Sequence, residues 1–408
     1  MIALETAFLE GLGKVEARAE HITGVQVDSR RIVEGDLFVA VGRGSEYLVD
    51  ARARGAAATL VPADPFAALA QIARAVRDRS SARIVGITGS MGKTSTKDIL
   101  AALCAPSART IAAEASYNNE IGVPLTLCRL EENTEVCILE LAMRGFGQIA
   151  ELCEIARPQI GVVTNVGPVH LELVDSLEGV RRAKRELIAA LPSGGTAVVP
   201  SDFPVERDDI HIVRIGEPQI DIADGRAVLS GVSFNFTARH QAQNAAAALG
   251  ALDALGLPRP ASVDVDFARW RGEEDELPGG GILINDAYNA NPVSMRAALA
   301  YLAERAGERR RVAILGDMAE LGRTGPDYHR EIGEAAAEVG VDELLAVGEL
   351  ARSYLEGGVP GRWVANVHEA VRALDAVVRP GDAVLVKASR ALGLEAVAAA
   401  LTQVPTRT

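Results

Sequence analysis

Hydrophobic and polar positions alternate along the chain in a pattern that predicts α/β structure in three successive regions. Short apolar runs, typical of strands, are separated by longer stretches in which apolar residues recur at helical spacing. In the first region the pattern predicts a small α/β unit over residues 1–82, with a short helical stretch at its start, strands at 25–28, 36–41 and 59–61, and helices at 52–58 and 65–76.

The second region begins with an apolar, β-branched run at residues 83–88. Comparable runs recur at 136–140 and 160–164, and helical stretches lie between and after them. Such runs are typical of parallel strands buried on both faces, so their alternation with helices predicts a doubly wound, mostly parallel sheet. An acidic stretch at 271–276, followed by Pro278 and three glycines, is interpreted as a linker that ends this region.

The third region repeats the alternation of strands and helices up to the end of the chain. The pattern predicts strands at 282–284, 312–315 and 383–386, a helix at 293–306, and a final alanine-rich helix. The predicted fold class is therefore α/β, with three domains at 1–82, 83–276 and 277–408.

Length and charge limit the function classes. The chain has 408 residues, of which 48% are hydrophobic and 24% charged, values that exclude a disordered or collagen-like protein. The formal net charge of −13 argues against nonspecific binding of nucleic acid or of an anionic membrane. A phosphate-bearing ligand would therefore need a dedicated local site.

The cysteines and the N-terminal segment predict a cytoplasmic protein. The N-terminus lacks a basic segment followed by an apolar one, and no apolar run approaches the ~20 residues that a membrane span needs. We therefore expect no membrane insertion. Four cysteines lie in apolar stretches without a C-x-x-C pair, which favours reduced core thiols over a zinc or dithiol site: Cys104, Cys128, Cys137 and Cys153.

The strongest chemical signal lies between the first strand of the second region and the helix that follows it. The segment reads Thr88-Gly89-Ser90-Met91-Gly92-Lys93-Thr94-Ser95. Glycines let successive backbone N–H groups turn toward a phosphate, the helix N-terminus adds a positive dipole, Lys93 adds charge, and the Thr94 hydroxyl can reach Mg²⁺. The strict phosphate-loop motif requires glycine where this chain has Ile87. The alternative is a structural turn with an incidental lysine.

Three further residues are candidates because of their predicted positions. Glu140 ends a buried strand at the sheet edge where ligands gather, so it is either a ligand of a nucleotide-bound metal or a solvated strand end. His170 follows the strand at 160–164 and is either structural or part of the same site. Lys184 lies on an apolar helical stripe, where burial would lower its pKa and leave a reactive neutral amine, unless its charge reaches the solvent.

Three polar loops of the third region follow predicted strands, and so they converge on one edge of its sheet. They lie at 285–292, 316–318 and 387–390. Simple turns would need fewer polar groups, so these loops are candidates for ligand contact.

Taken together, these segments resemble those of the Mur ligases, ATP-dependent amide ligases that build the peptidoglycan peptide. Asp-x-Tyr-Asn-x-Asn-Pro at 286–292 and Gly-Asp-Met at 316–318 are specific to one branch. The Asp-Asn-Pro-Arg signature of the branch that adds diaminopimelate or lysine is absent. The matching segments keep the family order over nearly the whole chain: 86–94, 118–125, 164–172, 286–292, 315–322 and 385–390.

The resemblance implies a uridine-nucleotide-binding N-terminal domain, a central phosphate-loop ATPase and a C-terminal Rossmann-like domain. It implies a ligation in which the carboxylate of UDP-N-acetylmuramoyl-tripeptide takes the γ-phosphate of ATP. The amine of D-alanyl-D-alanine then attacks the acyl phosphate, as a step in peptidoglycan precursor synthesis. We expect a monomer.

The resemblance also assigns roles to individual residues. ATP would bind at 88–95, with Lys93 on the β- and γ-phosphates. Thr94 and Glu140 would hold a first Mg²⁺, and His170 with a CO₂-derived carbamate on Lys184 would hold a second. The remaining implied contacts are Asn244 with adenine; Asp286, Asn289 and Asn291 with the nucleotide; Ser29 and Arg30 with the uridine diphosphate; Asn118 and Asn119 with the muramoyl peptide; and Lys387 and Ser389 with substrate.

The chain departs from the family pattern at three places. The Asp-Gly-His segment expected near 42–47 is missing, the usual Asn of the adenine motif is Gln241, and Glu140 is followed by Leu141-Ala142 instead of Met-Gly. Two other functions stay open at this point. One is another Mur-type or folylpolyglutamate-synthase-like ligase with a different acceptor, and the other is a nucleotide-gated scaffold with a degenerate catalytic centre.

Overall fold

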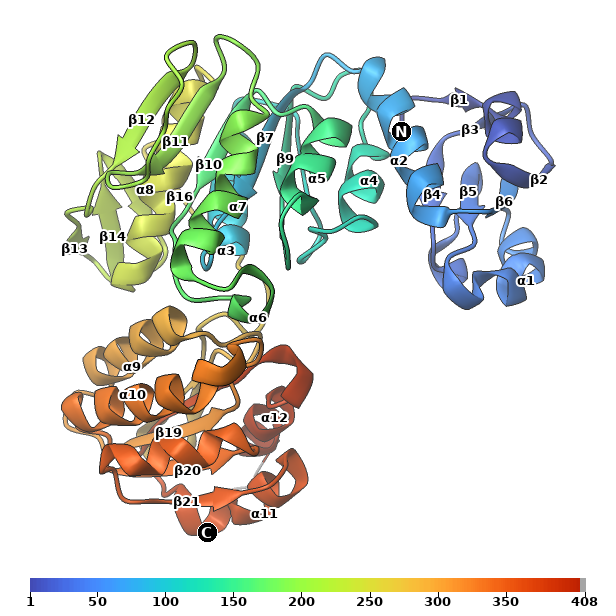
Figure 1. Cartoon of the computed structure of the whole chain (residues 1–408). Coiled ribbons are helices and arrows are strands. Elements are labelled where there is room, and N and C mark those ends of the chain that lie inside the picture. Colours follow the sequence, from blue (N-terminus) through green and yellow to red (C-terminus); the bar gives the residue numbers. More distant parts are fainter. Residues whose placement is uncertain (404–408) are drawn as a thin grey trace. The chain divides into compact units, whose positions relative to one another are not determined.

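The computed structural model describes residues 1–403 of an α/β protein that divides into two compact units. Helices and strands alternate through both units, and Figure 1 traces their order along the chain. The first unit consists of Met1–Asn165, Arg182–Thr237 and Gln241–Asp266, and the second of Val166–Arg181, Ala238–His240 and the chain from Phe267 onward.

The N-terminal part of the first unit is a mixed four-stranded sheet with two helices. Helix α2 begins where Asp64 accepts hydrogen bonds from the N–H groups of Phe66 and Ala67, and Pro65 occupies its first turn. The strand order is β2 (Gly13–Ala17), β6 (Ala58–Pro62), β5 (Asp36–Val39) and β4 (Gly24–Gln26), with helices α1 (Leu48–Ala53) and α2 (Pro65–Asp78) and a separate pair β1 (Leu4–Glu5) and β3 (His21–Ile22).

The helix expected at 52–58 is wrong. Helix α1 ends at Ala53, Gly55 adopts a φ of +99°, and Ala58 already belongs to strand β6. This strand pairs with β2 on one side and β5 on the other, so strand pairing overrides the helix propensity of its alanine. The pattern also missed β2, an edge strand whose side chains are mostly exposed.

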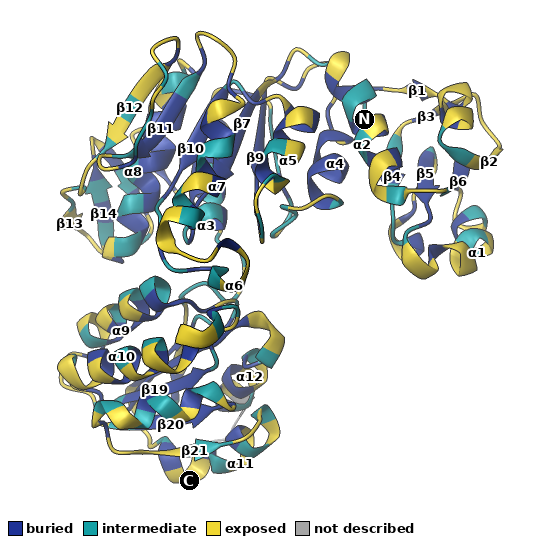
Figure 2. Cartoon of the chain, viewed as in Figure 1, coloured by how far each residue is buried: buried dark blue, intermediate teal, exposed yellow. Residues whose placement is uncertain are grey.

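The centre of the first unit is a six-stranded, fully parallel sheet, which confirms the predicted sheet. Figure 2 shows how thoroughly its central strands are buried. The strand order is β12 (His211–Ile215), β11 (Thr196–Pro200), β10 (Ile160–Val163), β7 (Arg83–Thr88), β9 (Val136–Glu140) and β8 (Thr110–Ala112), with helices α3 (Lys93–Cys104), α4 (Gly122–Leu127) and α5 (Gln148–Ala156). Helices α7 (Leu177–Ala189) and α8 (Arg239–Ala254) lie mostly in this unit, and their first residues belong to the second unit.

A small four-stranded sheet after Pro200 has no counterpart among the predicted elements. Its strands are β13 (Asp221–Ala223), β14 (Arg226–Leu229), β15 (Val232–Phe234) and β16 (Ser262–Val263). The first three form antiparallel hairpins through Asp224-Gly225 and Ser230-Gly231, all four residues with positive φ. Such dipeptides between short strands are a hairpin signal in the sequence.

The second unit is built on another six-stranded sheet, parallel except for one edge strand. The short helix α6 (Leu171–Val174) also belongs to this unit. The strand order is β17 (Glu273–Leu277), β18 (Gly281–Asn285), β22 (Ala383–Lys387), β19 (Arg311–Gly316), β20 (Glu343–Val347) and β21 (Gly361–Val364), with helices α9 (Pro292–Ala306), α10 (Gly325–Glu338), α11 (Val367–Val377) and α12 (Glu395–Gln403).

The linker expected at 271–276 is wrong, because residues from Glu273 onward form the edge strand β17. Four carboxylates fit this strand because its side chains are exposed up to Leu277. Glu274 also contacts the hydroxyl of Tyr301 and accepts from the guanidinium of Arg305 at 2.8 and 2.7 Å. The chain enters the second unit at Phe267, ten residues before the predicted third domain begins at 277. The three domain boundaries stay a prediction.

The four cysteines agree with the expectation of core thiols. Cys104, Cys128, Cys137 and Cys153 are buried free thiols, and burial raises the pKa of each to about 12. Among residues 1–403, none of the helices combines the length and the apolar character that crossing a membrane requires.

Candidate nucleotide and ligase site

The glycine-rich loop lies between β7 and the N-terminus of α3, as predicted. Gly92 has a φ of +77°, and a Cβ atom there would lie 2.1 Å from Oδ1 of Asn244. A Cβ on Gly89 would lie 1.8 Å from Oγ1 of Thr164. Both positions therefore require glycine, and the tight loop that they form leads directly into a helix N-terminus, whose dipole favours an anion.

Residues that follow β10 hold this loop in place. Asn165 accepts from the backbone N–H of Met91 at 3.0 Å through Oδ1, and its carbonyl accepts from the N–H of Ser90 at 3.2 Å. The hydroxyl of Thr164 donates to the carbonyl of Met91 at 2.5 Å. The loop is thus fixed by two neighbouring strands before any ligand binds, which favours a binding site over an incidental turn.

Lys93 extends from the first turn of α3 back over the loop. Its ammonium donates to the carbonyl of Gly89 at 2.8 Å. The hydroxyl oxygen of Thr88 is buried and has no hydrogen-bond partner among the described residues. The Lys93 ammonium and the N-terminus of α3 both place positive charge at this loop, so the loop is suited to binding a polyphosphate.

The Thr94 and Glu140 side chains meet at the carboxyl end of the parallel sheet. Both are buried, and the Thr94 hydroxyl donates to Oε2 of Glu140 at 2.7 Å. The amide of Asn118 donates to Oε1 of the same carboxylate at 2.8 Å. Glu140 is therefore not a solvated strand end. Hydroxyl and carboxylate oxygens are the hard ligands that Mg²⁺ prefers, so this pair fits a nucleotide-bound Mg²⁺.

The side chain of Asn119 has a local structural role. Its Oδ1 accepts from the backbone N–H groups of Ile121 and Gly122 at 3.3 and 3.0 Å, where α4 begins. Asn118, by contrast, points to Glu140. Contact of either asparagine with the muramoyl peptide stays a prediction.

The predicted uridine segment lies in the N-terminal sheet region. Ser29 is buried and its hydroxyl lowers the pKa of Asp50 by hydrogen bonding. Arg30 is exposed and forms a two-point ion pair with Asp28, with N–O distances of 2.6 and 2.9 Å. The next residue, Arg31, donates to the Tyr117 hydroxyl at 2.9 Å.

Asn244 lies in the first half of α8, beside the glycine-rich loop. It is buried, and its amide donates to Oε1 of Gln241 at 2.9 Å. The substitution of glutamine for the family's asparagine at position 241 therefore keeps an amide partner for Asn244. Contact of Asn244 with adenine stays a prediction.

Lys184 is the most unusual cation of the first unit. It is 2% exposed in the middle of α7. Within residues 1–403 no hydrogen bond or ion pair joins its ammonium to another side chain. Burial lowers the pKa of Lys184 well below its usual range, and the positive charge of Lys93 lowers it further. Burial therefore shifts the balance at this position from the ammonium toward the uncharged amine.

His170 occupies the N-cap of α6 in the second unit with a φ of 54°. Its Nδ1 contacts the carboxylate of Glu320, which itself has a φ of 63°. Positive φ is unfavourable for both residue types, and such strain clusters at functional sites. A carboxylate on Nδ1 leaves Nε2 as the nitrogen that can bind a metal.

The three polar loops of the second unit converge, as predicted. Lys387 is 2% exposed and donates to Asp286 at 2.6 Å and to the carbonyl of Asn289 at 2.7 Å. Ser389 accepts from the N–H of Ala319 at 2.8 Å. Lys387 and Ser389 thus hold the loops together, and their contact with substrate stays a prediction.

Asn291 and Asn289 differ in their roles within the 285–292 loop. Asn291 caps α9 through a reciprocal pair with Ser294, in which each side chain bonds to the other's backbone N–H at 3.0 Å. Asn289 is exposed, and its Oδ1 accepts from the N–H of Ala290. Of the predicted nucleotide contacts in this loop, Asp286 and Asn289 have the more accessible side chains.

A buried histidine supports the Gly-Asp-Met loop from below. His329 is 0% exposed, and its Nε2 accepts from the N–H of Met318 at 2.9 Å. Nδ1 must then carry the proton, which it donates to the carbonyl of Gly325 at 2.6 Å. The Tyr354 hydroxyl donates to the carbonyl of Gly316 at 2.9 Å. Burial lowers the pKa of His329, so the ring is neutral.

This network predicts an acid-sensitive second unit. Below its ordinary pKa of about 6.5, the unfolded chain takes up a proton that folded His329 excludes, so the free energy of unfolding falls as the pH falls below ~6.5. His329→Gln should reduce that slope by up to about 1.4 kcal/mol per pH unit. Urea unfolding at pH 5–8 measures it, and equal slopes in both proteins would contradict the assignment.

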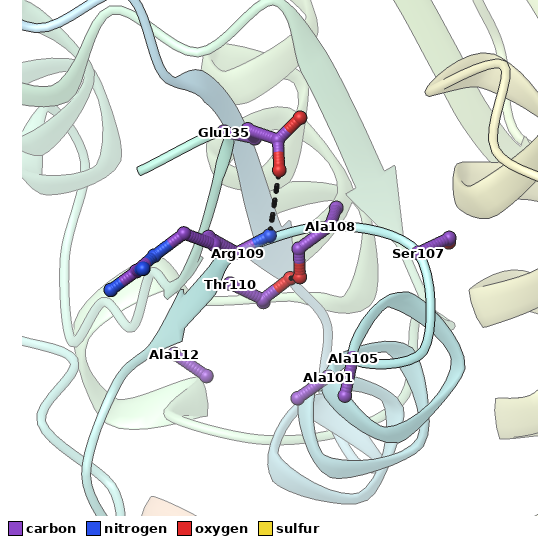
Figure 3. A pocket seen from close by; sticks show the side chains of 8 residues that line it. All are labelled: Ala101, Ala105, Ser107, Ala108, Arg109, Thr110, Ala112 and Glu135. Atoms are coloured by element: carbon purple, nitrogen blue, oxygen red, sulfur yellow. Dashed lines mark hydrogen bonds between the residues drawn. The ribbon is translucent and has the colours of Figure 1, made fainter. Parts of the chain in front are cut away.

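A pocket of about 630 Å³ in the first unit is lined by other residues (Figure 3). Ala101 of α3 and Ala105, directly after this helix, line it together with Thr110 and Glu135. The Glu135 carboxylate accepts from the N–H of Arg109 at 2.9 Å. Ala101 is eight residues from Lys93, about 12 Å along the helix. None of the predicted site residues lines this pocket.

Comparison with known proteins decides the family. The Mur ligase middle domain matches residues 87–252, and the Mur ligase, glutamate ligase domain matches residues 272–390. The UDP-N-acetylmuramoyl-tripeptide–D-alanyl-D-alanine ligase of Mycobacterium tuberculosis is 36% identical, over 95% of this chain and 93% of that protein. The chain belongs to the Mur ligase family.

Solved structures of Mur ligases agree with this assignment. MurF from Acinetobacter baumannii has a TM-score of 0.86 at 26% identity and covers 98% of this chain and 99% of that chain. The MurF ligase from Thermotoga maritima in complex with ADP has a TM-score of 0.80 at 26% identity, over 93% and 96% of the two chains. The predicted family and the predicted α/β Mur ligase architecture are confirmed.

Several side chains that contact the predicted site residues were not singled out by the sequence. Thr164, Asn165 and Glu320 lie within the family segments, but only the three-dimensional contacts show that they hold the loop and His170. Lys97 lies two positions after the glycine-rich segment and is buried. Among residues 1–403, no three His, Cys, Asp or Glu side chains form a preformed metal cluster.

Proposed function

We propose that the protein is an ATP-dependent ligase that joins D-alanyl-D-alanine to UDP-N-acetylmuramoyl-tripeptide in peptidoglycan precursor synthesis. The observation that carries this proposal is the near-complete alignment with the Mycobacterium tuberculosis ligase of that name. The contacts around Lys93, Thr94 and Glu140 support it, because they form a phosphate loop beside a carboxylate. A scaffold with a degenerate centre would not need to retain them.

The chemistry follows from the substrates. A carboxylate does not acylate an amine at neutral pH, so the tripeptide carboxylate first attacks the γ-phosphorus of ATP and ADP leaves. The dipeptide amine then adds to the carbonyl carbon of the acyl phosphate. The tetrahedral intermediate loses inorganic phosphate and a proton, and an amide remains. The loop N–H groups and the Lys93 ammonium stabilise the charge on the transferred phosphoryl group.

The proposed scheme uses two Mg²⁺ ions. Thr94 and Glu140 would hold one ion, and His170 with a carbamate on Lys184 would hold the other. Bound Mg²⁺ would neutralise phosphate charge as two anions approach each other. The neutral Lys184 amine supports the carbamate, because the uncharged form is the one that adds CO₂. Glu320 would orient His170 through Nδ1.

We also propose contacts with the substrates. Ser29 and Arg30 would bind the uridine diphosphate, and the convergent loops around Lys387 would contact the nucleotide and the dipeptide. The cytoplasmic location and the monomeric state expected from the sequence also stay predictions, and light scattering on the purified protein measures the latter.

ADP release with each substrate omitted in turn tests the function. With ATP, Mg²⁺, UDP-N-acetylmuramoyl-tripeptide and D-alanyl-D-alanine together, we expect rapid ADP release. The rate should fall at least tenfold when either the tripeptide or the dipeptide is missing, because both are consumed in the ligation. Release that needs a different acceptor would support another Mur-type ligase. Absence of release with every combination would support the scaffold.

A further inference from the structure

A buried lysine outside the glycine-rich loop links that loop's helix to the residues around Glu140. Lys97 lies on α3 and is 3% exposed. Its ammonium donates to the carbonyl of Ala113 at 2.8 Å and to that of Ala115 at 3.0 Å, and it pairs with Asp98 at 2.9 Å. Three acceptors thus satisfy the three N–H donors of the group.

Lys97 contacts the backbone of the segment 113–118, which includes Asn118. Ala115 has a φ of +45°, a conformation that is unfavourable for alanine and needs support from its surroundings. Three residues after Ala115, Asn118 donates a hydrogen bond to the carboxylate of Glu140. A closed ring of contacts results, from Thr94 through Glu140 and Asn118 to Lys97, which is three residues from Thr94 on the same helix.

Lysine usage in this chain points independently to a specific need at this position. The sequence has 37 arginines but only five lysines. Of these, only Lys14 is exposed, Lys93 lies in the phosphate loop, and three are at most 3% exposed: Lys97, Lys184 and Lys387. Because arginine is the basic residue at nearly all other positions, a lysine indicates a position that requires a compact ammonium with donors in three directions.

We propose that Lys97 is a positioning residue for the nucleotide-bound Mg²⁺, which acts through the segment 113–118 and Asn118 on the carboxylate of Glu140. The inference rests on the proposed function, in which Thr94 and Glu140 hold that ion. Without the Lys97 ammonium, the carbonyls of Ala113 and Ala115 lose their donor and the segment loses its conformation. Asn118 then no longer holds Oε1 of Glu140 in register with Thr94.

Calorimetric titration with ADP, with and without Mg²⁺, tests this role apart from turnover. In the unaltered protein, Mg²⁺ should strengthen ADP binding. Lys97→Met should reduce that gain by about tenfold, the usual effect of losing a residue that orients a metal ligand. ADP affinity in the absence of Mg²⁺ should stay unchanged, because Lys97 does not face the loop.

Arg83→Met is the matched control. Arg83 also donates to two carbonyls, those of Ala254 and Leu255, both at 2.7 Å, but from the opposite end of β7. Its loss should lower the melting temperature and leave the Mg²⁺-dependent gain intact. If Lys97→Met fails to fold, Lys97→Gln, which keeps one donor group, takes its place.

A double-mutant comparison decides whether Lys97 acts through Asn118. Asn118→Ala should reduce the Mg²⁺-dependent gain, and adding Lys97→Met should reduce it no further, because both changes break one path. Full Mg²⁺ gain in Lys97→Met, or effects of the two changes that multiply, would overturn the inference. A protein that binds no ADP at all would instead overturn the proposed function.

Discussion

Replacing Lys93 with alanine should abolish ATP turnover while leaving the fold intact. The ammonium of Lys93 is the cation that lies over the phosphate loop, 2.8 Å from the carbonyl of Gly89. Removing a group aimed at the charge of a transition state costs ~10²-fold or more in rate. Lys93 is only half-buried, so its loss leaves no large cavity. ADP release under saturating substrates measures the rate.

Lys14→Ala is the control, because Lys14 is exposed on the edge strand β2. Both variants should unfold at nearly the temperature of the unaltered protein. A Lys93→Ala rate within about tenfold of the unaltered protein would contradict the assignment, since phosphate-stabilising contacts matter by more than that.

The parallel sheets were predictable because their strands carry a strong local signal. The runs at 83–88, 136–140 and 160–164 correspond to β7, β9 and β10, which are buried on both faces. The phosphate loop was predictable for a related reason, because its glycines follow such a strand and precede a helix. The family resemblance then covered the order of the remaining segments.

The errors lie where tertiary pairing or exposure overrides a local pattern. The acidic residues of β17 suggested a linker, yet an edge strand tolerates carboxylates that face the solvent. Alanines near Ala58 suggested a helix, yet two neighbouring strands pair with them. The small sheet from β13 to β16 was missed because its strands have only two to four residues.

Partners within the site could not be predicted because they come from distant parts of the chain. Asn118 and Glu140 are 22 positions apart, and His170 and Glu320 are 150 apart. Spacing along the sequence carries no information on such pairs, and only strand order brings them together. Lys387 is a further example, since the sequence placed it in a polar loop after a strand, and only the structure shows its partner, Asp286.

The second large effect concerns Lys184, which we expect to react with CO₂. Its neutral amine would add to the carbon of CO₂ and release one proton, which yields a carbamate anion. The carbamate can bind Mg²⁺, but it is itself a buried charge, so we expect it to be stable at this position only when the metal is present. Stripping CO₂ from the buffer should slow the unaltered protein, and bicarbonate should restore its rate.

Lys184→Ala should be nearly inactive, with a loss of ~10² or more in rate, because a charge-stabilising metal site is lost. Acetate or formate should restore part of the activity, since a small carboxylate can occupy the space that alanine leaves. Chloride at the same ionic strength should not. Lys184→Glu should be weakly active, because its carboxylate does not reach as far as a carbamate.

Lys184→Met separates chemical rescue from a general effect of carboxylates. Methionine fills most of the volume of the buried lysine side chain without any charge, so this variant should be inactive and should stay inactive in acetate. Rescue of both variants alike would indicate a general effect of carboxylates. Full activity of Lys184→Ala, or a loss of activity that no added carboxylate rescues, would show that Lys184 is a packed helix lysine. The second Mg²⁺ would then need ligands other than Lys184. The positive φ of His170 and of Glu320, which contact each other, would need another explanation.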